Sequence, residues 1–156
     1  MNILQISARI IIKHTFDLSV WSIEAFSVME PYHDKVSKIR KLENGTVGKA
    51  IADSLDNSKM TLIPKYESHD LKHVLLDYNM TEEGEIRLQA FMVGNGNYSI
   101  TSCGILIFGV VLLPELWSTL LADFKKGKAS VPLAEWTIEK YANRNLIELR
   151  SEIAYS

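Results

Sequence analysis

Hydrophobic and polar residues follow one another along most of the chain with the spacing of amphipathic helices. Val47, Ile51 and Leu55, for example, share one side of a predicted helix, and signals for strands are weak throughout. The predicted helices cover residues 4–27 (as one or two helices), 31–41, 46–55, 61–78, 82–92, 98–113, 116–124, 130–141 and 143–150. The pattern therefore predicts an all-α fold, a single compact multi-helix domain over residues 1–156, although the isoleucine run at 10–12 would also suit a short strand.

The helix predicted over residues 61–78 carries two histidines four positions apart, His69 and His73. At about 100° per residue they lie on one face together with Asp70 and Asp77, while an apolar stripe that includes Leu71 lies on another side. Side chains four apart on a helix have Cβ atoms about 5–6 Å apart. This is the spacing that a single metal ion needs from two imidazole ligands.

A carboxylate follows this helix after a turn. Eleven residues separate His73 from Glu85, and the turn between them ends at Thr81, the predicted cap of the next helix. We expect the second helix to fold back beside the first, so that Glu85 reaches the histidines. Asp77, one turn beyond His73, is a candidate for supporting a ligand or transferring a proton, and a surface position suits it equally well.

Two interpretations of these residues remain open. His69, Asp70 and His73 are either the solvated side of an amphipathic helix or, with Glu85, the ligands of a divalent metal ion. Two imidazoles with one or two carboxylates suit zinc or another first-row ion.

Two enzyme classes share part of the pattern. The motif of zinc proteases has glutamate where this chain has Asp70, whose side chain is one methylene shorter and reaches a metal-bound water less well. Phosphohydrolases with a His-Asp pair need a further histidine and aspartate, for which His14, His33 and Asp123 are the candidates. Nothing in the sequence around these three residues supports that assignment.

Composition narrows the possible partners. The net charge is −2 and the largest basic cluster is the short segment 125–128, so nucleic acid is not expected as a partner. One cysteine excludes an internal disulfide framework, and no secretory signal is evident, so we expect a cytoplasmic protein. The uncharged segment 98–113 is shorter than the roughly 20 residues that cross a bilayer. It predicts a buried core helix or, alternatively, a helix that contacts lipid.

The string His69-Asp70-x-x-His73, eleven residues, Glu85 resembles the signature of the coenzyme Q (ubiquinone) biosynthesis family of small helical proteins. The segment 45–48, Gly-Thr-Val-Gly, and the segment 84–86, Gly-Glu-Ile, are also similar to that family. The resemblance is strongest over residues 43–92, and the chain looks like a short bacterial relative.

The resemblance implies a divalent metal ion, most commonly zinc, held by His69, Asp70, His73 and Glu85, with Asp70 and Glu85 also serving the catalytic step. It implies removal of the ring carboxylate of a prenylated quinone precursor with hydroxylation at that carbon, peripheral contact with the inner face of the membrane, and an apolar path for an isoprenoid tail. A non-catalytic isoprenoid-lipid-binding protein or scaffold of a quinone biosynthesis complex is the alternative. A homodimer is compatible with the apolar content, and no heptad specifies one.

Overall fold

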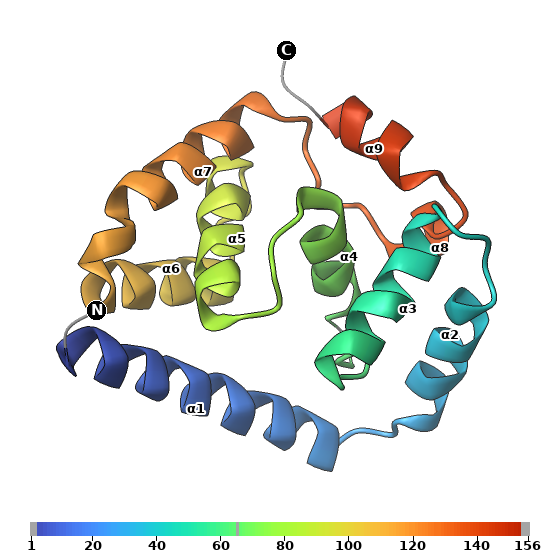
Figure 1. Cartoon of the computed structure of the whole chain (residues 1–156), viewed down its shortest axis with the longest axis horizontal. Coiled ribbons are helices and arrows are strands. Elements are labelled where there is room, and N and C mark those ends of the chain that lie inside the picture. Colours follow the sequence, from blue (N-terminus) through green and yellow to red (C-terminus); the bar gives the residue numbers. More distant parts are fainter. Residues whose placement is uncertain (1–2, 65, 154–156) are drawn as a thin grey trace. The chain divides into compact units, whose positions relative to one another are not determined.

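The structure is a computed structural model that describes residues 3–64 and 66–153. Its helices are shown in Figure 1. They are α1 (Ile3–Ala25), α2 (Glu30–Arg40), α3 (Val47–Ser58), α4 (Glu67–Leu76), α5 (Glu82–Gly94), α6 (Ile100–Leu112), the 3₁₀ helix η1 (Pro114–Leu116), α7 (Trp117–Ala129), α8 (Ile138–Tyr141) and α9 (Leu146–Ile153). Within the described ranges the only β-type pairing is an isolated bridge between Thr46 and Asn145. The predicted all-α fold is confirmed, and the isoleucine run belongs to α1.

The chain divides into two compact units. The first contains Met1–Phe16, Tyr78–Glu135 and Ile153–Ser156, and the second contains Asp17–Asp77 and Trp136–Glu152. One boundary therefore falls within α1 and another directly after α4. The single domain over residues 1–156 stays a prediction.

In the first unit, α5 packs against α6 and α7 (Figure 1). Two glycines bring the backbones of α5 and α7 close together. A Cβ at Gly94 would lie 2.1 Å from the carbonyl oxygen of Phe124, and one at Gly127 would lie 2.0 Å from that of Phe91. Such distances are far below van der Waals contact, so only glycine permits this packing. The apolar core beside it consists of Ala8, Ile12, Ile86, Ala90, Leu113, Leu116 and Leu120.

This packing corrects the predicted end of α7. Lys125, Lys126 and Gly127 have the order of a helix terminus, cations followed by glycine, yet α7 continues to Ala129. Gly127 is buried inside the helix because its missing side chain makes room for α5, not because the chain needs a left-handed residue there.

α6 packs along only part of its surface. Ile105, Leu106 and Val110 lie against the core of the first unit, whereas Ile107 and Val111 are 64% and 70% exposed. The predicted burial is therefore found on the face of α6 that packs on the core, and the opposite face is exposed. Among the described helices, none by itself has the length and apolar character to cross a membrane. The helices Ser102–Leu112 and Pro114–Ala129, which meet at a bend of 105°, are together long and apolar enough to do so.

In the second unit, α3 packs against α2, α4 and α8 (Figure 1). The segment before α3 joins it to the chain's last quarter: Val47 N donates to Arg144 O at 2.9 Å, and Gly48 N donates to Ala142 O at 2.8 Å. A Cβ at Gly48 would lie 3.0 Å from the Cβ of Ala142. Thr46 caps α3 as predicted, accepting a hydrogen bond from Lys49 N. The segment 45–48 thus has a structural role in this chain.

Two predicted helices are wrong in their extent. The helix expected over 61–78 is α4, which covers only Glu67–Leu76. Proline disfavours helical backbone at the residue before it, and Pro64 follows Ile63, whose carbonyl accepts from Tyr66 N in a turn.

The helix expected over 130–141 is reduced to α8, Ile138–Tyr141. The side chain of Asn95 supplies the hydrogen bonds that a helix would have made in the preceding segment. Its Nδ2 donates to the carbonyl oxygen of Val131 at 2.9 Å, and its Oδ1 accepts from Leu133 N at 2.8 Å. Pro132 between them has no N–H to donate.

Candidate metal centre

His69 and His73 lie together on α4, in the second unit. Their ring centroids are 4.6 Å apart, with the rings edge to face at 70°. A ligand nitrogen of one lies within 4.8 Å of a ligand nitrogen of the other. His73 is buried, and His69 keeps 27% of its side-chain surface exposed. The predicted pairing of the two imidazoles is thus present within one helix, with one ring facing the interior and the other in partial contact with solvent.

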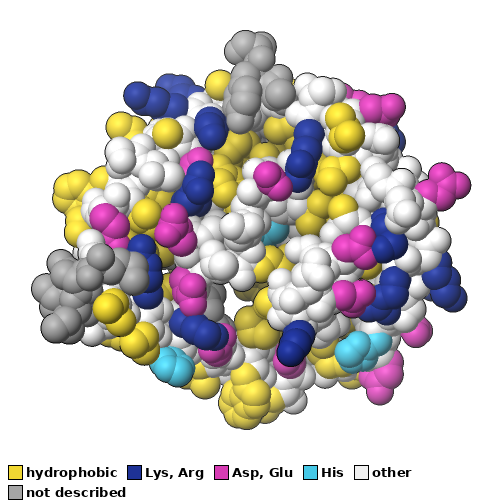
Figure 2. Space-filling model, viewed as in Figure 1, with side chains coloured by type: hydrophobic (Ala, Val, Ile, Leu, Met, Phe, Trp, Pro, Cys, Tyr) yellow, Lys and Arg dark blue, Asp and Glu magenta, His cyan; other side chains and the backbone are white. Residues whose placement is uncertain are grey.

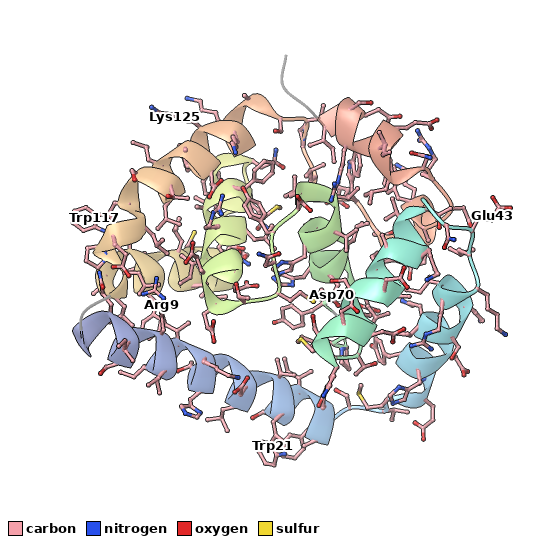
Figure 3. All side chains as sticks on the ribbon, viewed as in Figure 1. Arg9, Trp21, Glu43, Asp70, Trp117 and Lys125 are labelled. Carbon is pink, nitrogen blue, oxygen red and sulfur yellow. The ribbon has the colours of Figure 1, made fainter. Side chains whose placement is uncertain are left out.

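Asp70 lies on the same helix (Figure 3) and is 4% exposed. Its Oδ1 is 3.8 Å from Nδ1 of His69. Among the described side chains, Oδ2 of Asp70 is one of two buried polar atoms without a hydrogen-bond partner. Leaving a carboxylate oxygen buried without a partner is costly. Its chemistry therefore suits a cation or a proton at this position.

α4 is buried on nearly all sides, contrary to a helix with one solvated face. Leu71 and Leu75 are buried as expected, and Asp70, Lys72 and His73 are buried as well, each less than 10% exposed. This burial does not fit the interpretation of Asp70 and His73 as a surface feature. The burial of Lys72 was not predicted, because an isolated lysine on a helix is normally solvated.

Asp77 does not lie on the histidine face of α4. It follows the last helical residue in the left-handed conformation, with φ of 60°, and its side chain is 85% exposed. Its Oδ1 accepts from Nη2 of Arg150 at 3.1 Å. Of the two positions expected for Asp77, the surface is the one found.

Glu85 lies in the first turn of α5, in the first unit. Thr81 caps this helix as predicted, accepting a hydrogen bond from Gly84 N at 3.1 Å. A Cβ at Gly84 would lie 1.9 Å from the carbonyl oxygen of Asn79, so glycine is required for the turn to fold against the helix start. Glu85 is 9% exposed, and its Oε1 accepts from Nε2 of Gln89 at 2.6 Å. This bond orients a buried carboxylate.

The donor set of the predicted site is compatible with a divalent ion. The second unit offers two imidazole nitrogens from one helix and an unpaired buried oxygen of Asp70 beside them, and the first unit offers the oriented carboxylate of Glu85. Imidazole and carboxylate ligands of this kind bind zinc at about 2.0–2.2 Å, and they bind other first-row ions as well. The residues fit a metal ion without selecting which one.

The residues that hold the ends of α4 have no signal in the local sequence. Arg150 donates from Nη2 to the carbonyl oxygen of Val74 at 2.7 Å, 76 positions away. Lys35 donates from Nζ to Oε1 of Glu67, the first residue of α4, at 3.0 Å. Both partnerships join segments that lie far apart in sequence, so spacing rules within one helix do not reveal them.

The residues considered for a His-Asp phosphohydrolase have other roles or none. His14 and His33 are exposed. Asp123 is 1% exposed, and its carboxylate accepts from Tyr78 Oη at 2.9 Å and from Arg87 Nε at 2.8 Å. Asp123 thus has partners within its own unit that account for its burial.

The fold has a solved counterpart. The chain is similar to the crystal structure of a protein from Nostoc punctiforme PCC 73102 that carries a provisional assignment to ubiquinone biosynthesis. The TM-score is 0.60 and the identity 18%, and the match covers 97% of this chain and 81% of that chain. No family model matches the sequence. No curated protein matches it either. The likeness therefore concerns the helical fold, which this chain shares with the Nostoc protein.

Proposed function

We propose that this protein binds one divalent metal ion through His69, His73 and Glu85 and uses it in a ubiquinone-biosynthesis-like step. His69 and His73 belong to the second unit and Glu85 to the first, and each side chain offers a nitrogen or oxygen that a metal ion can bind. The observation that carries the proposal is the pairing of two imidazoles on α4 beside a buried, unpartnered carboxylate oxygen of Asp70. The shared fold with the Nostoc protein supports the same assignment.

Each residue has a distinct task in this proposal. His69 and His73 are neutral ligands, because only the unprotonated imidazole nitrogen coordinates a metal. Glu85 is a ligand that also serves the catalytic step, because its carboxylate brings a negative charge to the metal ion. Gln89 orients this carboxylate by donating a hydrogen bond from Nε2 to Oε1. Asp70, the fourth predicted ligand, keeps a free oxygen in the same neighbourhood and is our candidate for proton transfer.

The proposed substrate is a prenylated aromatic acid, a precursor of a quinone. The bond between the ring and its carboxylate breaks, carbon dioxide leaves, and the electron pair stays on the ring carbon. A bound divalent ion, with zinc as the first candidate, supplies a Lewis acid that stabilises this negative charge. Asp70 then relays a proton from solvent to the carbon. Replacement of the carboxylate by a hydroxyl group would take the place of this protonation: one oxygen atom of dioxygen would join the ring carbon, and the other would leave as water, reduced by two electrons from an external reductant.

A second function, non-catalytic binding of an isoprenoid lipid or a scaffold role in a quinone biosynthesis complex, has its own supporting observation. Apolar side chains lie on the outer surface of α6 and α7, where Figure 2 shows hydrophobic atoms and where Trp117 points outward in Figure 3. They are Ile107, Phe108, Val111, Trp117 and Leu121. We propose a cytoplasmic protein that contacts the inner face of the membrane through such residues and forms a homodimer. Sedimentation analysis tests the homodimer.

The experiment combines metal content with turnover. Protein purified without chelators is analysed for bound metal and then incubated with a prenylated hydroxybenzoate while carbon dioxide release is measured. We expect close to one metal per chain and turnover in the wild type, and loss of both in His73→Ala with an unchanged circular dichroism spectrum.

The matched control is His33→Ala, which removes an exposed histidine that also precedes an aspartate. We expect it to keep metal and turnover. Binding of prenyl-lipid vesicles that survives His73→Ala, without turnover in any variant, would support the lipid-binding function instead. Absence of metal from the wild type after incubation with zinc, cobalt and manganese would contradict the metal site itself.

A further inference from the structure

The helix that carries His69 and His73 is short, and only its C-terminus is capped, by the backbone N–H of Asp77, which donates to the carbonyl oxygen of His73. α4 has ten residues, and at its N-terminus no side chain of the preceding residue, Tyr66, caps it. Isolated helices of this length are marginal in water. Whatever holds the two ends of α4 therefore also decides how well the two imidazoles keep their spacing.

Arg150 of α9 holds the C-terminal end. Its Nη2 donates to the carbonyl oxygen of Val74 at 2.7 Å and to Oδ1 of Asp77 at 3.1 Å. The last four carbonyl groups of a helix have no partner within the helix, and a cation there also stabilises the negative end of the helix dipole. Val74 directly follows His73, so this contact lies one residue from a proposed ligand.

Lys35 of α2 holds the N-terminal end. Its Nζ donates to Oε1 of Glu67 at 3.0 Å and to Oε1 of Glu139 at 2.6 Å. Glu67 is the first residue of α4, two positions before His69, and Glu139 belongs to α8. A single ammonium group thus ties the start of α4 to two other helices of the same unit.

We propose that Arg150 and Lys35 are positioning residues for the metal ligands. Each adds a charged contact from another helix at one end of α4, and together they keep the ring nitrogens of His69 and His73 within reach of one ion. This inference rests on the proposed metal site and adds two residues to it that touch neither metal nor substrate. The affinity for metal then depends on side chains of α2 and α9.

The test measures cobalt affinity and helix opening separately. Arg150→Gln and Lys35→Met are compared with the wild type by competition for Co²⁺ against a chelator, followed through the absorption of the bound ion. The measurements are made at 10 °C, under conditions where denaturant titration shows each variant to be folded, so that global unfolding does not lower the affinity. Amide hydrogen exchange of α4 is measured in the metal-free proteins.

Matched controls exist for both substitutions. Arg144→Gln removes an arginine that pairs with Glu152 at the surface of the same part of the chain. Lys49→Met removes a lysine that pairs with Asp53 within α3. Neither control residue contacts α4 through these pairs. Arg150→Lys keeps a cation whose single nitrogen has several N–H donors, so we expect it to restore part of the affinity.

We expect Arg150→Gln and Lys35→Met each to weaken cobalt binding about tenfold, at the lower end of the effect of residues that orient metal ligands. Exchange of α4 amides should also become faster, and the controls should match the wild type. Unchanged affinity in both variants, with cobalt bound by the wild type, would overturn the positioning role alone. A wild type that binds no cobalt would overturn the metal site and this inference together.

Discussion

Tyr78 donates a hydrogen bond of 2.9 Å from its hydroxyl to Oδ1 of Asp123, a buried carboxylate 45 positions further along the chain. Arg87 binds the other oxygen, Oδ2, through Nε at 2.8 Å and lies over the Tyr78 ring, 5.3 Å from its centroid. The guanidinium group has a raised pKa, in the first place through its hydrogen bond to Asp123. These three residues form a buried charged cluster inside the first unit.

Asp123→Ala should destabilise the protein, because it removes the buried counter-charge of Arg87 and the carboxylate that accepts from the Tyr78 hydroxyl. Breaking a buried ion pair costs about 3–5 kcal/mol. Because Arg87 is partly exposed, we expect the free energy of unfolding to fall by about 3 kcal/mol. Urea unfolding measures it. Tyr78→Phe removes one neutral donor and should cost only about 1 kcal/mol. Equal losses of stability in the two variants would contradict a larger contribution from the ion pair of Arg87 and Asp123 than from the hydrogen bond of Tyr78.

Glu85→Gln should lower the affinity for a divalent ion about 100-fold or more while leaving the helix intact. The substitution keeps the size of the side chain and removes the negative charge that a metal ligand supplies. Isothermal titration with Zn²⁺ measures the change. The control is Glu82→Gln, at the first position of the same helix. If both variants bind zinc equally well, Glu85 is not a ligand.

Gly127→Ala should destabilise the first unit by about 3 kcal/mol, since the new Cβ would lie 2.0 Å from the backbone oxygen of Phe91 and force α5 and α7 apart. Gly104→Ala is the matched control. It also lies within a helix, but its Cβ would meet no described atom within 4 Å. There alanine should stabilise by about 0.5–1 kcal/mol through its higher helix propensity. Thermal denaturation distinguishes the opposite signs.

The pairing of Glu139 with Lys35 should make stability fall in acid. The pKa of Glu139 is lowered, chiefly by the hydrogen bond from Lys35, so its carboxylate binds protons less readily in the folded chain than in the unfolded one. Its contribution is complete above the ordinary value of 4.5 and is lost as the pH falls through the lower folded value. Because Glu139 is largely exposed, we expect less than about 1 kcal/mol.

Urea midpoints measured from pH 6 to pH 2 test this dependence. The wild type should lose more stability over the acid part of this range than Lys35→Met, in which the carboxylate has lost its partner. Parallel curves for the two proteins would contradict a contribution from the pair. Lys49→Met again serves as the control and should follow the wild type.

Local features of the candidate site were predictable from the sequence. Thr81 caps α5, and Glu85 lies one turn inside that helix next to Gln89. The two histidines share a helix and lie close together. Each of these features depends on residues at most four positions apart, where the geometry of one helical turn decides which groups meet.

The extent of the elements was less predictable, because distant groups decide it. Asn95 takes the backbone hydrogen bonds of the segment around Val131 and Leu133, so no helix begins at residue 130. Gly127 looks like a helix end in sequence, but α5 packs against it and the helix continues. The local pattern of apolar and polar residues predicts neither the missing helix start nor the continuation of α7.

The sequence by itself determined the helical class, the caps at Thr46 and Thr81, and the placement of His69 and His73 on one face, since hydrogen bonding and periodicity within a few residues decide these features. The tertiary structure decided that Asp70 is buried and that Arg150 holds the end of α4. Burial and long-range hydrogen bonds depend on which segments pack together. That choice arises from the whole chain and has no signature within a single helix.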